Sequence, residues 1–241
     1  MKPIKLMAAV FLVLLCLICS EAYVGCYDLD KGEKLTYAVR FLYIIPVGDA
    51  TMEVKDVAGN EDNANYLITC EAKTAKWISL LFKAQALLNS YVTGENLYPV
   101  KFEQILKVAG KPDDIRRATY DRTANIMEAQ GKGAKKVPPD VRDSISSIYY
   151  LRAQDLKEGA EIKQTVNNNQ SNYIFNSKVT GKKKIGKLDC WVLAAKIRRE
   201  NKSMYHSMDV TLYLTDDAKK TPLRIKAMTK VGPLSLTLKS R

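Results

Sequence analysis

The chain has 241 residues, 46% of them hydrophobic, and a formal net charge of +12 at pH 7, so it is long enough to bury a substantial core in one domain. The positive charge favours anionic partners, but no aromatic-rich basic stripe accompanies it, and we expect no nucleic-acid partner. A single histidine, His206, excludes metal sites and zinc-protease motifs that need two histidines.

An export signal opens the chain. Two lysines precede an apolar run over residues 7–18, and small residues before residue 23 fit the −3 and −1 positions of a signal-peptidase site. The run is shorter than the roughly 20 residues of a spanning helix, and no later stretch approaches that length. We expect residues 1–22 to be a signal peptide and residues 23–241 to form one exported, β-rich domain that is not an integral membrane protein.

Cys26 lies just beyond this cleavage site. If it is acylated, the protein is a membrane-anchored lipoprotein; small Gly25 suits such a signal, whereas bulky Tyr23 departs from it. A free thiol is the alternative, and the sequence leaves both open.

Alternating apolar and polar residues predict strands over most of the remaining chain. The first half favours strands over residues 35–43, 50–54, 66–72, 85–93, 100–108 and 115–120. Between the third and fourth of these, Trp77, Leu80 and Leu81 are spaced as on one or two helical turns and form a bulky apolar patch.

The second half begins with a basic stretch over residues 132–139, which indicates a flexible connector. Pro138-Pro139-Asp140 then precedes a predicted helix over residues 141–153, with Asp140 and Asp143 resembling a capping box. Strands are predicted to follow over residues 162–166, 173–179, 190–199, 210–214, 223–231 and 234–238.

These elements predict a mainly β fold: an antiparallel, strongly curved sheet or barrel of about 10–12 strands with one crossing α-helix. Cys70 and Cys190 lie in strand-like segments and are candidates for a disulfide bridge, which an oxidising compartment would favour; buried free thiols are the alternative.

No catalytic constellation is recognisable, so we expect a protein that is not an enzyme and needs no cofactor or metal. His206 is the only histidine that could serve a nucleophile, and it stands in a polar stretch. The carboxylate pairs Asp113-Asp114 and Asp216-Asp217 lie beside basic residues, as is typical of solvated turns.

Segments along nearly the whole mature chain, in order, resemble an exported bacterial family catalogued as domain of unknown function 3108. The segments that show the resemblance are Gly32-Glu33-Lys34-Leu35-Thr36-Tyr37, Val47-Gly48-Asp49-Ala50, Tyr98-Pro99-Val100-Lys101-Phe102, residues 140–152 and Leu214-Thr215-Asp216-Asp217. The resemblance implies a β-rich protein in the periplasm of a Gram-negative bacterium, with no accepted catalytic residues. Its outline is also similar to that of lipoprotein carriers of the LolA/LolB type, a likeness at the level of fold alone.

The family signature over residues 140–152 includes Asp143, Ser144, Tyr149 and Arg152. A structural role is the simpler interpretation of this helix, and Arg152 then needs a carboxylate or carbonyl partner where it meets the sheet.

Several strands are apolar on both faces, so the interior of the sheet is either filled or shaped as a cavity for an acyl chain. Our leading hypothesis is a cell-envelope protein that binds or carries a lipid-like or other amphiphilic component. Its expected ligand-binding residues are Trp77, Leu80, Leu81 and Trp191, with Lys183, Arg198 and Arg199 attracting an anionic headgroup. The alternative is a structural or scaffolding envelope protein with a filled core and protein partners.

Overall fold

The computed structural model describes residues 29–57, 64–80, 82–94, 96–168, 171–202, 207–229 and 231–241. The expected signal peptide and Cys26 lie outside these residues, so both remain predictions.

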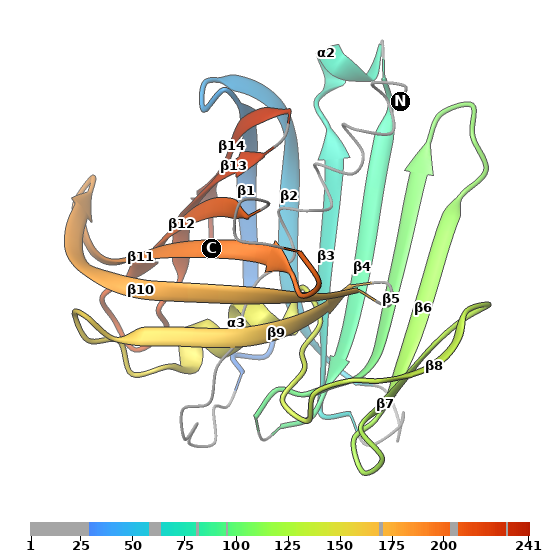
Figure 1. Ribbon diagram of the computed structural model, residues 1–241. Helices are drawn as coiled ribbons and strands as arrows, with labels where there is room; N and C mark the ends of the chain where they lie inside the picture. Colours follow the sequence, from blue (N-terminus) through green and yellow to red (C-terminus); the bar gives the residue numbers. More distant parts are fainter. Residues whose placement is uncertain are drawn as a thin grey trace.

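One continuous antiparallel sheet of 14 strands makes up most of the described chain (Figure 1). The mainly β fold is thus confirmed, with more strands than the 10–12 expected. The first eight strands are β1 (Lys34–Phe41), β2 (Ile45–Asp56), β3 (Tyr66–Thr74), β4 (Ala84–Val92), β5 (Pro99–Val108), β6 (Asp114–Asp121), β7 (Ile126–Ala129) and β8 (Gly133–Lys136). The other six are β9 (Glu161–Asn168), β10 (Ser171–Ile185), β11 (Leu188–Arg199), β12 (Met208–Thr215), β13 (Pro222–Thr229) and β14 (Gly232–Ser240).

The sheet consists of two meanders joined along the first and last strands. Strands β1 to β8 follow one another in order, as do β9 to β14, and β1 pairs with β14 so that Tyr37 lies opposite Leu238. The two outer edges, β8 and β9, do not pair with each other, so the sheet is curved and open. In Figure 1, β9 to β11 lie crosswise to the upright strands β3 to β6.

Apolar side chains of both meanders meet on the concave side of the sheet. Burial alternates along the strands, as in β3, because every second side chain points inward. One continuous cluster of buried residues joins both meanders, including Ile68 and Leu88 of the first with Phe175, Leu193 and Leu212 of the second.

Helix α3 (Ser146–Ala153) crosses the sheet, which confirms the expected crossing helix, but it begins later than residue 141. Val141 and Arg142 are extended instead, because the Arg142 backbone forms an isolated parallel bridge to Val166 of β9. The short helix α2 (Lys76–Ser79) forms one turn between β3 and β4.

Candidate functional site

The signature residue Asp143 caps helix α3 from inside the protein. Its Oδ1 accepts hydrogen bonds from the backbone amides of Ile145 at 2.7 Å and Ser146 at 2.9 Å, and Ser90 of β4 donates to Oδ2 at 2.5 Å. Ser144 is also buried, and its carbonyl accepts a bond from Ser147. Asp143, and not Asp140 as the sequence suggested, therefore satisfies the start of the helix.

Burial raises the pKa of Asp143, although the Ser90 hydroxyl and the two amides oppose the rise. The Asp143 carboxyl therefore holds its proton more tightly in the folded state than in the unfolded state, where an aspartate has a pKa of about 4. Its contribution to stability is present at low pH and is lost as pH rises through the folded pKa.

Replacing Asp143 with asparagine is expected to remove this pH dependence while keeping an oxygen for the two amides. Urea midpoints of both proteins, measured from pH 3.5 to pH 7, should show the variant gaining stability relative to the wild type as pH increases. Parallel profiles would contradict the raised pKa.

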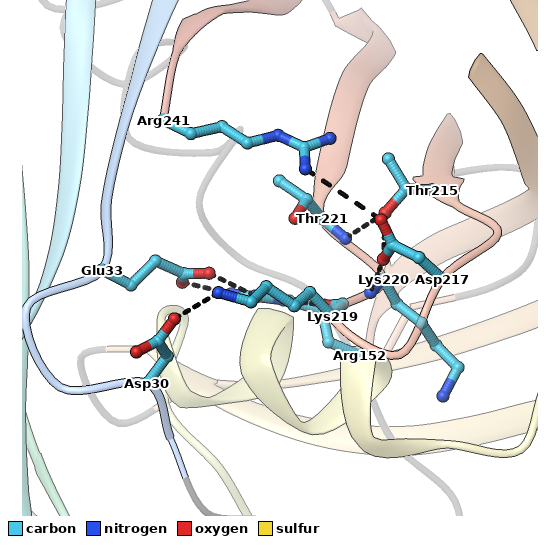
Figure 2. Close-up of polar contacts among 9 residues, drawn as sticks. All are labelled: Asp30, Glu33, Arg152, Thr215, Asp217, Lys219, Lys220, Thr221 and Arg241. Atoms are coloured by element: carbon cyan, nitrogen blue, oxygen red, sulfur yellow. Dashed lines mark hydrogen bonds and ion pairs between the residues drawn. The ribbon is translucent and has the colours of Figure 1, made fainter.

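The signature residue Arg152 joins the end of α3 to the start of β1 (Figure 2). Its guanidinium donates to both carboxylate oxygens of Glu33 at 2.6 and 2.7 Å and to the carbonyl of Lys219 at 3.0 Å. The Tyr149 ring lies 4.8 Å from the guanidinium. The side chains of Arg152 and Glu33 are only 3% and 8% exposed. The expectation that Arg152 needs a carboxylate or carbonyl partner is confirmed by both kinds of partner.

Exposed ion pairs surround this buried one. Lys219 pairs with Asp30, and the Lys219 ammonium holds the pKa of Asp30 below its usual value. Asp217 accepts hydrogen bonds from Thr215 at 2.8 Å and from the Lys220 amide at 2.9 Å, which shapes the β12–β13 turn. We call Asp30, Glu33, Arg152 and Lys219 the α3 clamp. Its contacts connect α3 to the start of β1 and to the β12–β13 turn, which is a structural role.

Cys70 and Cys190 are free and buried, so the bridge considered from the sequence is not formed. They lie on β3 and β11, which five other strands separate in the sheet. Burial raises the pKa of Cys70 to about 12, which keeps this thiol protonated and unreactive.

The residues expected to bind a ligand are dispersed over three places. Trp77 lies on α2 and Leu80 directly follows it, whereas Leu81 lies outside the described residues. Trp191 and Lys183 lie near the β10–β11 turn, with Lys182 4.3 Å from the Trp191 ring. Arg198 and Arg199 are at the opposite end of β11. The structure therefore does not bring the six described residues together as one site.

A cluster of exposed apolar side chains gathers at one end of the sheet. Among the described residues, eight large hydrophobic side chains are exposed, and six of them lie on the β1–β2 turn, at α2 and at the end of β13. We call these six residues the apolar tip: Leu42, Tyr43, Ile44, Trp77, Leu80 and Met228. Ile44 and Leu80 are the most exposed, at 74% and 89%.

Direct contacts hold the parts of the apolar tip together. The Trp77 indole donates to the carbonyl of Pro46 at 2.9 Å, which ties α2 to the start of β2. The Leu42 amide donates to the carbonyl of Pro233 at 2.8 Å, and Pro233 lies opposite Met228 in the β13–β14 pair. The tip is therefore one surface built from segments that are distant in the sequence.

The β1–β2 turn holds its apolar side chains outward at a cost. Leu42 and Tyr43 have φ angles of +52° and +65°, in the left-handed region that bulky residues rarely occupy. Each such residue costs on the order of 1–2 kcal/mol relative to a relaxed backbone. Strain of this kind, kept at an exposed position, points to a functional surface.

An open groove of about 430 Å³ lies on the outer face of β9 to β12. Its charged lining residues are two lysines and two acids, Glu161, Lys178, Lys196 and Asp209, and Lys196 pairs with Asp209 at 2.7 Å. The balanced charges give the groove no preference for an anionic or cationic ligand. None of the ligand-binding residues expected from the sequence lines it.

Sequence reasoning missed Leu42, Tyr43 and Ile44 as part of a site. The available signal was an apolar run that continues on both faces up to Pro46, where a strand with one solvated face would alternate.

Within the described residues, no helix is both long and apolar enough to span a bilayer.

The open curved sheet, the clamped helix and the apolar tip define a mainly β protein of the barrel-like, curved-sheet class. The chain belongs to the family described as "Protein of unknown function (DUF3108)", whose model matches residues 36–239. This confirms the resemblance noted in the sequence. No curated protein is similar enough to the chain to count as a match.

Three solved structures are similar to the chain to different degrees, all at low sequence identity. A beta-barrel-like protein of the DUF1849 family from Brucella abortus is similar with a TM-score of 0.60 at 7% identity, over 89% of this chain and 98% of that chain. A DUF1089 family protein from Pseudomonas aeruginosa has a TM-score of 0.41 at 9% identity, over 85% and 94%. Lipoprotein LppX of Mycobacterium tuberculosis has a TM-score of 0.27 at 13% identity, over 86% and 85%. The first likeness is one of fold alone, and the other two carry no argument.

Proposed function

We propose that this chain is a non-enzymatic protein of the bacterial cell envelope that binds a lipid-like, amphiphilic component at the apolar tip. The observation that supports the proposal is the gathering of six exposed apolar side chains at one end of the sheet. Contiguous apolar patches on monomeric proteins commonly mark interaction sites. The export signal expected over residues 1–22 supports the envelope as the compartment.

The chemistry of the tip suits an apolar ligand. The indole N–H of Trp77 already donates to Pro46, so the ring can leave water without losing a hydrogen bond. Tyr43 combines an aromatic ring with a polar hydroxyl, as do residues at the boundary between water and lipid.

A structural protein with protein partners is the second candidate. The two outer strands of the sheet, β8 and β9, favour it because they do not pair with each other. An exposed edge offers backbone groups to a strand of a partner.

The proposal is tested by the fluorescence of Trp77. The chain has two tryptophans, so Trp191→Phe leaves Trp77 as the only emitter. Micelles of zwitterionic lysophosphatidylcholine are expected to shift its emission to shorter wavelength. In the same background, Ile44→Ser with Leu80→Ser should abolish the shift, because both side chains would enter the micelle.

Leu188→Ser is the matched control, since Leu188 is 45% exposed at the opposite end of the sheet and should leave the shift intact. Unchanged emission in micelles, together with stoichiometric recovery of a protein partner from envelope extracts, would favour the structural candidate instead.

A further inference from the structure

We infer that the apolar tip docks on a lipid bilayer that contains anionic phospholipid, and that the cations beside the tip contact the headgroup phosphates. This inference rests on the proposed function and names its partner. Three cations lie beside the tip: Arg40, Lys76 and Lys226.

Two of these cations share one face of the sheet. Arg40 of β1 and Lys226 of β13 both lie opposite Ser235 of β14, so their side chains leave the same face about 10 Å apart, two strand spacings. The Lys226 ammonium lies 5.0 Å from the Tyr43 ring centroid, which places it at the tip. On α2, exposed Lys76 directly precedes Trp77.

These cations are available to an anion. Among the residues that the structure describes, none of the three forms an ion pair with a carboxylate. Carboxylates on the strands around the tip are already paired with lysines of their own, at 2.7 to 3.0 Å: Asp49 with Lys239, Glu71 with Lys73, and Asp209 with Lys196. The tip therefore has a locally positive rim.

An apolar surface with a cationic rim matches the boundary of an anionic bilayer. Apolar side chains enter to the depth of the headgroups, while lysine and arginine contact phosphates at the same level. The exposed aromatic side chains Tyr43 and Trp77 are the residue types enriched at that level in membrane proteins. A protein groove would need a complementary acidic rim, and that partner is an outcome of the test below.

The experiment measures cosedimentation of the whole mature protein with vesicles. One set contains phosphatidylcholine alone, and the other contains phosphatidylcholine with a third of phosphatidylglycerol. We expect at least tenfold stronger partitioning onto the anionic vesicles at low salt, and its loss in high salt, because screening weakens contacts between surface charges. The salt measurement needs no variant.

The variant Arg40→Gln with Lys226→Gln should weaken binding to anionic vesicles by roughly fivefold for each charge removed, about 25-fold together. Ile44→Ser with Leu80→Ser should abolish binding to both vesicle types. The matched control, Lys187→Gln with Leu188→Ser, changes one cation and one apolar residue at the opposite end of the sheet and should bind like the wild type.

Equal partitioning onto both vesicle types, or undiminished binding by Arg40→Gln with Lys226→Gln, would overturn this inference and leave the proposed function standing. The same holds if micelles are bound and vesicles are not. If neither is bound and an acidic protein alone is captured at the tip, both the inference and the proposed function are overturned.

Discussion

Replacing Arg152 with methionine is expected to destabilise the protein by about 3–5 kcal/mol, the cost of leaving one member of a buried ion pair without its partner. The Glu33 side chain is only 8% exposed, so its carboxylate has lost most of its contact with water. The two hydrogen bonds from Arg152 offset that desolvation cost. The Lys219 carbonyl would also lose its donor. Urea unfolding at pH 7 measures the loss directly.

Two further variants separate this effect from a general loss of packing. Glu33→Met combined with Arg152→Met removes both charges, and most of the stability should return. Lys219→Met removes only an exposed ion pair of the α3 clamp and should leave the midpoint unchanged. If Arg152→Met costs less than about 1 kcal/mol, the clamp does not hold α3 to the sheet.

Replacing Leu193 with alanine is expected to cost about 2–5 kcal/mol, because the side chain is fully buried and the surrounding cluster cannot close the space left behind. The measurement tests whether the concave side is filled. Around an open chamber the same leucine would already face a void, and its truncation would remove far fewer contacts.

Leu188→Ala is the matched control for this variant. It makes the same change on the same strand, β11, but at a side chain that is 45% exposed, so its effect should stay within about 0.5 kcal/mol. If Leu193→Ala lowers the free energy of unfolding as little as Leu188→Ala does, the interior around Leu193 is not packed. An internal site for an acyl chain is then the better hypothesis.

Most of the sheet could be predicted from the sequence, because one solvated face produces alternation. Strands β7 and β8 were both missed, and β8 was missed for the corresponding reason. All four residues of β8 are exposed, so Gly133–Lys136 has no buried face to produce a pattern and looked like part of a basic connector. Only pairing with β7 makes it a strand.

The start of α3 was predicted too early because tertiary contacts decide it. Val141 and Arg142 suit a helix by local pattern, yet the Arg142 backbone bonds to Thr165 and Asn167 of β9. The helix can begin only after that pairing ends and Asp143 supplies the cap. The register of a distant strand is not readable from residues 141–153.

The apolar tip was foreseen only in part. The exposed residues Trp77 and Leu80 were expected to bind ligand, but their neighbours on the β1–β2 turn were not, because Leu42 and Tyr43 lack the glycine or asparagine that normally indicates a left-handed turn. The Trp77–Pro46 bond spans 31 positions, and such proximity exists only once β2 and β3 have paired.

The β1–β14 pair is a seam between the two meanders, and it sets the order in which the molecule can assemble. Each meander is built from hairpins that close locally, whereas the seam requires Tyr37 to find Leu238, 201 positions further along the chain. Contacts of such long sequence separation form slowly, because the chain entropy of closing the intervening loop must be lost first. The second meander ends in the very strand that completes the seam, so a ribosome must synthesise and release β14 before the two halves can join.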